Sequence, residues 1–402
     1  MRKHLLVVGG NDSSAVKAAE LDVDVSLFQL RRLLTPAQIA SVTRVFVFDF
    51  EHLDATLSLA RALHAHYPLD AAVSFWERAL LPASLAGEAL GVRTNPSSAV
   101  RVTRDKLAMR ALLAADAADP VRFCSCPSMS ELLRFLDQVG RPIVLKPTLG
   151  SGSVGVSIVR TSEDAEGAWQ WAARTGLQPF IAEEYIEGPE YSVESLSLDG
   201  QHRILGVTEK HTTGPPHFIE IGHRFPADIP ERMFDRVSDV VVRLLEHVGH
   251  VVGPAHSEVR LVGDRPIVIE TQTRFGGDQI WEMVELVLGV DLTKTTCAHL
   301  LGLPPPPVLP RAGGAAIRFF AYENCHLSAV SGLDESRSAP GVVRVECKLH
   351  AGDRLGPLTS SSARQGYVLA CAESSVEAWH RAGEAIGRLH VLTESPSDRG
   401  EQ

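Results

Sequence analysis

The first 93 residues alternate short apolar runs with stretches of helical pattern. The apolar runs lie at residues 5–8, 45–48 and 71–75, and a helical stretch over 77–90 follows the last of them. Continuous apolar runs of this length are typical of strands buried on both faces, and strands separated by helices pair in parallel. The sequence therefore predicts an α/β fold that opens with a doubly wound parallel sheet.

Beyond residue 93 the pattern predicts helices and strands without a regular alternation, so the fold is expected to be α+β in parts. The predicted helices are 97–115, 163–174, 231–248 and about 376–388. The predicted strands are 143–146, 156–159, 180–185, 191–198, 205–209, 256–262 and 266–271. The polar stretch 209–226, rich in histidine and proline, is predicted to be a loop or lid.

A chain of 402 residues is too long for one hydrophobic core, and its punctuation suggests four modules. The predicted modules are residues 1–93, 94–185, 186–310 and 311–402. Four consecutive prolines at 304–307 mark the linker before the last of them. That module is predicted to be a small α+β unit, and its last dozen polar residues are expected to be disordered.

The charge balance limits the kinds of partner. Thirty-nine Lys and Arg against 49 Asp and Glu give a net charge of −10, which argues against a nucleic-acid or anionic-membrane surface. No apolar stretch approaches the roughly 20 residues of a membrane span, and the first apolar run is too short for a signal peptide. We expect a cytoplasmic protein with small-molecule partners, and a homodimer is the default assembly.

The cysteines indicate a reducing compartment. Six cysteines in a chain of this length do not make a disulfide framework. Cys124 and Cys126 form a C-x-C pattern, but no second Cys or His pair lies near them in the sequence. Structural or incidental thiols are therefore favoured over a metal site.

A glycine- and serine-rich segment joins two predicted strands, and Lys146 ends the first of them. The small residues of the segment are Gly150, Ser151, Gly152, Ser153 and Gly155. Glycines allow backbone N–H groups to approach a polyphosphate closely, and serines add further donors. The segment does not open a helix, so it is not a P-loop. It is predicted either to bind phosphate or to be an ordinary mobile hairpin.

The predicted strands 256–262 and 266–271 carry a row of charged and amide side chains. Alternation groups His256, Glu258 and Arg260 on one strand, and Glu270, Gln272 and Arg274 on and just beyond the other. If these strands are antiparallel neighbours, Glu258 and Glu270 meet across the ladder. Two carboxylates and an amide oxygen suit Mg²⁺, and the arginines would attract phosphoryl oxygens. The alternative is a solvated sheet face balanced by salt bridges.

The order of these motifs resembles that of the ATP-grasp superfamily, most closely the branch of L-amino-acid ligases (dipeptide synthetases) and related carboxylate–amine ligases. The motifs are Asp105-Lys106, Lys146 before the Gly/Ser hairpin, the segment EEYIEGPE at 183–190, Glu258, and Glu270-x-Gln272-x-Arg274. The resemblance covers residues 70–393 and implies an ATP-grasp fold. A biotin-carboxylase-like carboxylase and a nucleotide-binding protein without catalysis are the alternatives.

The resemblance implies roles for individual residues. ATP would be bound by Lys106, Lys146, residues 150–155 over the phosphates, Glu183, Glu184 and Ile186 in the hinge, and Glu190 at the ribose. Two Mg²⁺ ions, or Mn²⁺, would be held by Glu258, Glu270 and Gln272. Arg274 would stabilise the transferring phosphoryl group. Gln272 departs from the family, which usually has Asn there, and this puts the coordination geometry in doubt.

The resemblance also implies a substrate pocket beside Arg274. Its predicted residues are Arg260, Arg274, Gly276, Gly277, Asp278 and Glu77. Asp278 is expected to recognise a cationic group of an amino-acid substrate. The candidate bases for the attacking amine are His211, His217, Glu220, His223 and His256, of which His256 is favoured because it shares a strand face with Glu258. The implied reaction joins a carboxylate to an amine through an acyl phosphate and releases ADP and phosphate.

Overall fold

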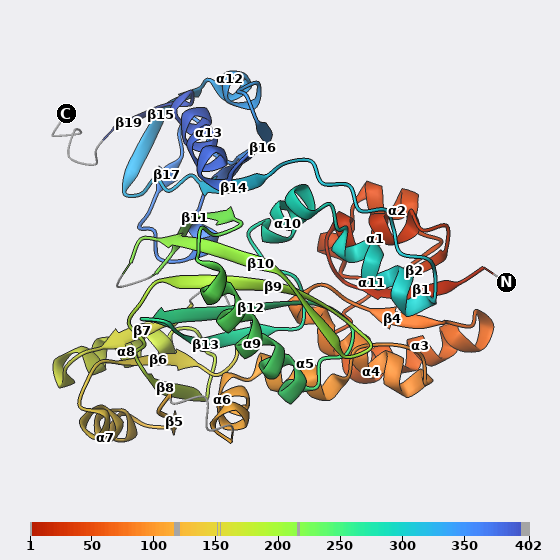
Figure 1. Ribbon diagram of the computed structural model, residues 1–402, viewed down its shortest axis with the longest axis horizontal. Helices are drawn as coiled ribbons and strands as arrows, with labels where there is room; N and C mark the ends of the chain where they lie inside the picture. Colours follow the sequence, from red (N-terminus) through yellow and green to blue (C-terminus); the bar gives the residue numbers. More distant parts are fainter. Residues whose placement is uncertain (1, 116–120, 151, 153, 215–217, 395–402) are drawn as a thin grey trace.

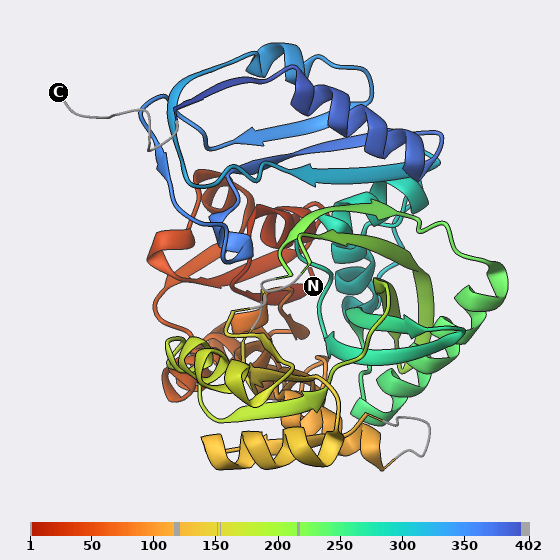
Figure 2. The ribbon, with the colours of Figure 1, turned by 90° about the vertical axis from the view of Figure 1, so that its left-hand side faces the viewer.

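The computed structural model describes residues 2–115, 121–150, 152, 154–214 and 218–394. Within these ranges the strands form four sheets of four, eight, three and four strands (Figure 1). In Figure 2 the C-terminal strands (blue) lie at one end of the molecule and the sheet of residues 123–184 (yellow) at the other. None of the helices in the described ranges has the length and apolar character needed to cross a membrane.

The N-terminal sheet is parallel, as predicted. Its strands are β1 (His4–Val8), β2 (Asp24–Gln29), β3 (Arg44–Val47) and β4 (Ala71–Val73), in the order β3-β2-β1-β4. Alternate residues of β1 enter two different cores: Leu5 and Val7 pack towards helices α1 (Asp12–Ala19) and α11 (Leu292–Leu301), whereas Leu6 and Val8 pack towards α3 (Leu53–His66) and α4 (Leu80–Leu90). Helices therefore cover both faces, which confirms the doubly wound arrangement.

A second sheet of four strands is antiparallel. It consists of β5 (Phe123–Cys126), β6 (Ile143–Pro147), β7 (Ser157–Val159) and β8 (Phe180–Glu184), in the order β5-β8-β6-β7. Helices α7 (Met129–Val139) and α8 (Ser162–Ala173) bury their apolar faces on it. The glycine-rich segment connects β6 to β7, so it is a turn between strands, as its sequence predicts.

The predicted helix 97–115 is wrong as a single element. Asp105 has an extended backbone (φ −102°, ψ 105°) and separates α5 (Ser97–Arg104) from α6 (Lys106–Ala114). Its carboxylate accepts hydrogen bonds from the backbone N–H groups of Leu107 and Ala108. Asp stabilises a helix start in this way, and the same residue therefore ends one helix and begins the next.

The largest sheet has eight strands, in the order β13-β12-β9-β10-β11-β14-β18-β16. Its strands are β9 (Glu190–Leu198), β10 (Gln201–Thr212), β11 (Glu220–Phe225), β12 (Gly253–Val262), β13 (Arg265–Gln272), β14 (Gly314–Phe319), β16 (Val342–Cys347) and β18 (Gly366–Ala372). Helix α9 (Glu231–Val248) covers β9, β10 and β12, and α10 (Ile280–Leu288) packs near β11 and β14. Three strands of the predicted C-terminal module thus extend the sheet that carries the predicted metal hairpin.

The stretch 209–226 is not a long loop, contrary to the prediction. Most of it belongs to β10 and β11, which pair as an antiparallel hairpin. The alternation along these strands is hidden in the sequence because polar side chains point to both faces. Residues 215–217, at the turn, lie outside the described residues.

The rest of the C-terminal segment forms a small sheet of β17 (Arg354–Leu355), β15 (Cys325–Ser331) and β19 (His390–Glu394), together with α12 (Leu333–Arg337) and α13 (Ser375–Gly387). Helix α13 packs on β14 and β18. The predicted disorder of the last dozen residues is wrong for the first of them, which belong to β19; residues 395–402 lie outside the described residues.

A buried histidine makes the stability of this fold depend on pH. His250 is 2% exposed, and burial lowers its pKa to about 4 from 6.5. Between pH 4 and 6.5 this histidine is protonated in the unfolded chain but neutral in the folded protein. The free energy of unfolding should therefore rise by about 3 kcal/mol across this range, and this group should add nothing further above pH 6.5. Urea unfolding across this range should show a weaker pH dependence in His250→Gln, whereas His66→Gln, at an exposed site, should match the wild type. Equal slopes in all three would contradict the assignment.

Candidate active site

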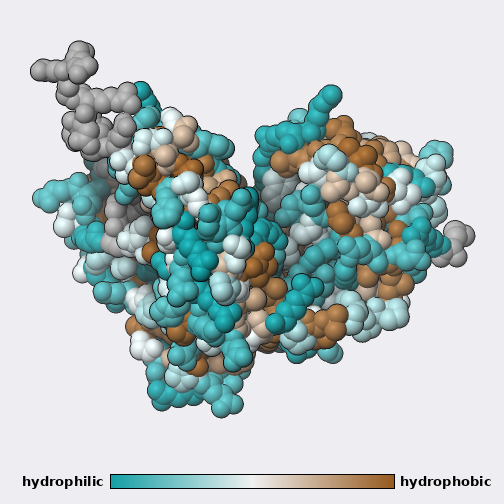
Figure 3. All heavy atoms as spheres, turned by 90° about the horizontal axis from the view of Figure 1, so that it is seen from above, coloured by the Kyte–Doolittle hydropathy of each residue, from teal (hydrophilic) through white to brown (hydrophobic). Residues whose placement is uncertain are grey.

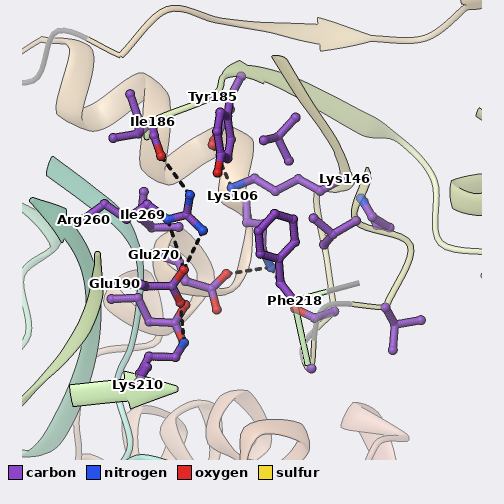
Figure 4. A pocket seen from close by; sticks show the side chains of 18 of the residues that line it. Lys106, Lys146, Tyr185, Ile186, Glu190, Lys210, Phe218, Arg260, Ile269 and Glu270 are labelled. Atoms are coloured by element: carbon purple, nitrogen blue, oxygen red, sulfur yellow. Dashed lines mark hydrogen bonds and ion pairs between the residues drawn. The ribbon is translucent and has the colours of Figure 1, made fainter. Parts of the chain in front are cut away.

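A cavity of about 140 Å³ lies between the antiparallel four-stranded sheet and the eight-stranded sheet. It is lined by Lys146 and the glycine-rich turn from one side, and by the acidic strands β9, β12 and β13 from the other. Figure 4 shows these side chains pointing towards one another from both sheets. Ser151 and Ser153, two predicted phosphate ligands, lie outside the described residues.

Lys146 stands at the wall of this cavity and is held by a buried carboxylate. Its Nζ lies 2.7 Å from Glu183 Oε2, and Glu183 also contacts the Nε of Arg110 at 3.3 Å. Burial alone would raise the pKa of Glu183, but the two cations hold it below its usual range. The side chain of Glu183 thus orients Lys146. Glu184 is tied in the same way to Arg122 and Arg141.

Glu190 and Arg260 form a second charged group in the same cavity. The guanidinium of Arg260 donates two hydrogen bonds to Glu190 Oε2, at 2.9 and 3.1 Å, and one to the carbonyl of Ile186 at 2.8 Å (Figure 4). It also lies over the rings of Tyr185 and Phe218. Arg260, a predicted substrate residue, thus lines the first cavity, where its contacts hold it beside Ile186 and Glu190.

Lys210 is a residue that the sequence analysis missed. Its Nζ lies 2.5 Å from Glu190, 2.8 Å from Glu258 and 3.8 Å from Glu220, and the side chain is only 4% exposed. Burial alone would lower its pKa, but these carboxylates raise it well above the usual value. The alternation of side chains along β10 could have identified Lys210 as a cavity residue. The prediction of a loop from residue 209 onwards prevented this.

The predicted pair of carboxylates meets as expected. Glu258 of β12 is directly opposite Glu270 of β13 in the antiparallel ladder, and His256 is opposite Gln272. A β-bulge follows, because Val259 pairs with Val268 and Ile269 therefore has no partner residue in the ladder. Both Ile269 and Glu270 consequently line the cavity. Ile269 was not predicted, because alternation alone assigns it to the opposite face.

The remaining contacts of the pair come from cations and one amide. Lys106 Nζ lies 3.2 Å from Glu270 Oε2 and donates to the carbonyl of Gly150 at 2.8 Å, while Gln272 Nε2 donates to Glu270 Oε1 at 2.8 Å. In the described part of the chain no three His, Cys, Asp or Glu side chains are grouped so as to hold a metal ion.

His256, the favoured base, has both ring nitrogens against carboxylates. Nδ1 lies 2.7 Å from Glu194 Oε1 and Nε2 lies 3.6 Å from Glu258 Oε1. Burial alone would lower its pKa, but the two carboxylates raise it to about 9. Nδ1 is thus engaged in a hydrogen bond, whereas Nε2 lies only at ion-pair distance from Glu258. A Cβ at Gly276 would lie 2.8 Å from this ring, which explains the glycine there.

A second cavity has a volume of about 940 Å³. It lies among the carboxyl ends of β1 and β4, residues 274–279 and strand β16. Figure 3 shows the surface hollowed between the body with the C-terminal module and the N-terminal domain. The predicted substrate residues Glu77, Arg274, Gly276, Gly277 and Asp278 all line this cavity.

Asp278, which was predicted to recognise a substrate cation, is paired with cationic side chains of the protein itself. Arg364 donates to both of its oxygens, at 2.6 and 2.8 Å, and His223 Nε2 lies 3.1 Å away. Burial alone would raise the pKa of Asp278, but these two partners hold it well below its usual range. Arg364 comes from a distant loop, so its position could not be predicted locally.

The other candidate bases are separated in the structure. The ring of His211 packs on the ring of Trp379, with 4.2 Å between their centroids, on the face of the sheet away from both cavities. His223 is paired with Asp278. Glu220 lines the first cavity and accepts a hydrogen bond from Ser361 at 2.6 Å. His217 lies outside the described residues.

Comparisons with known proteins agree with this arrangement. Family models match for an ATP-grasp N-terminal domain (residues 16–93), an ATP-grasp domain (139–282) and an L-amino acid ligase C-terminal domain 2 (318–394). Carnosine synthase 1 of Mus musculus is 26% identical over 82% of this chain and 43% of that protein. Alanine–anticapsin ligase of Bacillus subtilis (strain 168) is 26% identical over 56% and 52%. The chain spans about half the length of the curated relatives it matches.

The fold is shared with a solved structure, that of L-amino acid ligase from Bacillus licheniformis. The TM-score is 0.82 at 23% identity, over 98% of this chain and 100% of that one. The three family matches follow one another in the order of the N-terminal parallel sheet, the two sheets around the first cavity and the C-terminal strands. The chain therefore belongs to the ATP-grasp superfamily, in the branch whose C-terminal module is that of the L-amino acid ligases.

Proposed function

We propose that this protein is an ATP-dependent carboxylate–amine ligase that joins two amino acids or amino-acid-like substrates through an acyl phosphate. The observation that carries the proposal is the direct pairing of Glu258 with Glu270 in the first cavity. Glu270 precedes Arg274 by four residues, and Arg274 lines the second cavity, so this segment links the proposed phosphate-binding region to the proposed substrate space. The names of the similar ligases support the same substrate class.

The first cavity has the chemistry of an ATP site. Lys106 and Lys146 provide ammonium groups for phosphate oxygens, and the glycine-rich turn provides backbone N–H groups. Ile269 and the apolar residues of the turn provide a wall for the adenine ring. Glu190, held by Arg260 and Lys210, would accept hydrogen bonds from the ribose hydroxyls.

The acidic pair has donors that fit Mg²⁺. Lys210 and His256 both contact Oε1 of Glu258, and no described residue engages its Oε2. Glu270 and Gln272 add hard oxygen donors, and nucleotide phosphates would complete the shell. When bound, Mg²⁺ would neutralise charge on the transferring phosphoryl group. Mn²⁺ also prefers carboxylate and carbonyl oxygens. The extra methylene of Gln272, compared with Asn, changes the reach of its amide oxygen towards a second ion.

The protein's own groups would carry out positioning and charge neutralisation. A carboxylate attacks the γ-phosphate and gives an acyl phosphate, whose leaving group is phosphate. Arg274 would bind the oxygens that gain charge, and Lys106 would hold the β- and γ-phosphates near Glu270. The amine then attacks the acyl carbon. Among the candidate bases, Glu220 is the one whose carboxylate lines the first cavity without a full set of protein partners.

A screen of amino-acid pairs with ATP and Mg²⁺ tests the proposal. We expect phosphate release that requires both amino acids, and a product whose mass equals their sum minus one water. Bicarbonate in place of an amino acid serves as the control for carboxylation. Phosphate release that depends on bicarbonate, or no release with any pair, would overturn the ligase assignment.

The proposed setting is a reducing cytoplasm, consistent with six free cysteines.

A further inference from the structure

A chain of three charged side chains connects the N-terminal domain to the second cavity. Glu77 begins the short 3₁₀ helix η2 (Glu77–Ala79) that follows β4. Its Oε2 lies 2.9 Å from the Nε of Arg274, and its Oε1 lies 3.2 Å from the Nε of Arg104, the last residue of α5. One carboxylate thus receives two guanidinium groups, one on each oxygen.

We propose that Arg104 is a positioning residue that acts through Glu77 to orient Arg274 for the transferring phosphoryl group. The inference rests on the proposed function. Arg274 is fixed by two of its nitrogens, because Nε binds Glu77 and Nη1 donates to the carbonyl of Phe275 at 2.9 Å. Among the described residues its Nη2 has no hydrogen-bond partner, so this nitrogen remains for an anionic oxygen. The direction of Nη2 depends on where Glu77 is held.

The ion pair with Arg104 restricts the rotation of the Glu77 carboxylate. A carboxylate bound by a single guanidinium can rotate about its last torsion, which is broad for Glu. The hydrogen bond from Arg274 and the ion pair with Arg104 act on separate oxygens of Glu77, and together they restrict the plane of its carboxylate. The side chains of Arg104, Glu77 and Arg274 are 31%, 22% and 15% exposed, so solvent screens this group only in part.

The break between α5 and α6 explains how Arg104 can reach Glu77. Asp105 interrupts the helix, and the next residue, Lys106, turns to the first cavity, where its Nζ meets Glu270 and Gly150. Arg104 contacts Glu77 on the substrate side, whereas Lys106 contacts Glu270 on the phosphate side.

An ion pair that only tethers the N-terminal domain would behave differently from a positioning contact. Loss of a tether lowers stability and leaves turnover per folded molecule unchanged. Loss of a positioning contact lowers kcat, because a misplacement of about 1 Å costs up to about 100-fold in rate. Arg101, an exposed arginine on the same helix, is a matched control.

The test compares Arg104→Met, Arg104→Lys, Glu77→Gln and the double variant Arg104→Met/Glu77→Gln with Arg101→Met and the wild type. For each protein, amine-dependent phosphate release gives kcat and KM, and calorimetry gives the Kd for ATP. We expect Arg104→Met to lower kcat about 10- to 100-fold with an unchanged Kd for ATP. Arg104→Lys should recover part of the loss, and Arg101→Met should match the wild type. The double variant should be no slower than Glu77→Gln alone, because the two residues act in series.

Wild-type kcat in Arg104→Met, or losses that multiply in the double variant, would overturn this inference while leaving the ligase proposal in place. A wild-type protein without amine-dependent turnover would overturn the proposed function, and this inference with it.

Discussion

Replacing Glu270 by Gln should lower kcat by about three orders of magnitude or more without unfolding the protein. The substitution keeps the shape of the side chain but removes the charge that faces Lys106 at 3.2 Å and Glu258 across the ladder. An amide is a poorer ligand for Mg²⁺ than a carboxylate, and the phosphoryl group would lose much of its charge neutralisation. The measurement is the rate of amine-dependent phosphate release at saturating substrates, with circular dichroism as the check on folding.

Two controls accompany this variant. Glu209→Gln changes a glutamate of the same sheet that is paired with Arg224 and does not line either cavity, so its rate should stay close to the wild type. Removal of divalent ions with EDTA should abolish the wild-type rate. A rate for Glu270→Gln within tenfold of the wild type would exclude the acidic pair as the metal site.

The sequence was sufficient to predict that the two acidic strands pair as an antiparallel hairpin, because alternation and the Gly263-Asp264 turn are local information. It was not sufficient to predict the register of the pair. Counted from the turn, Ile269 would lie opposite Glu258, and the β-bulge at this point places Glu270 there instead. The parallel N-terminal sheet was also predictable from local information, since its buried strands are continuous apolar runs.

Long-range pairing was not predictable from one sequence. The C-terminal strands β14, β16 and β18 join the same sheet as β9–β13, although a proline-rich linker separates them in the chain. A local pattern shows that a strand exists but not which edge it meets. The distant loop that brings Arg364 to Asp278 is a consequence of this pairing, so the protein partners of Asp278 could not be predicted from the sequence around it.

The oppositely charged partner of each side chain was the other information that the sequence did not provide. Arg260 has the residue type of a phosphate ligand and lies on the predicted strand, yet Glu190 and the hinge carbonyl of Ile186 engage it. Whether a charged side chain is free to bind a ligand depends on neighbours from other elements. The polar stretch at 209–226 concealed one such neighbour, Lys210, because charges on both faces of a strand resemble a loop.

Lys210→Met should be among the most destabilising single substitutions in this protein. The ammonium is 4% exposed and lies between Glu190 and Glu258, so its removal leaves two carboxylates close together with reduced compensation. Breaking a buried ion pair from one side costs about 3–5 kcal/mol, because the remaining charge is left desolvated. The expected result is a loss of this size in the free energy of unfolding by urea. Lys348→Met, at an exposed position, should change it by less than about 0.5 kcal/mol.

A second substitution separates lost charge balance from lost packing. Lys210→Met/Glu190→Gln removes one of the two carboxylates, so the double variant should be more stable than Lys210→Met alone. It should still bind ATP more weakly than the wild type, because the amide at 190 replaces the charged acceptor proposed for the ribose. If the double variant is less stable than Lys210→Met, the carboxylates are not what Lys210 neutralises. In that event the destabilisation arises from the packing of the lysine stem along β10, and Glu258 reaches its position in the ladder without Lys210.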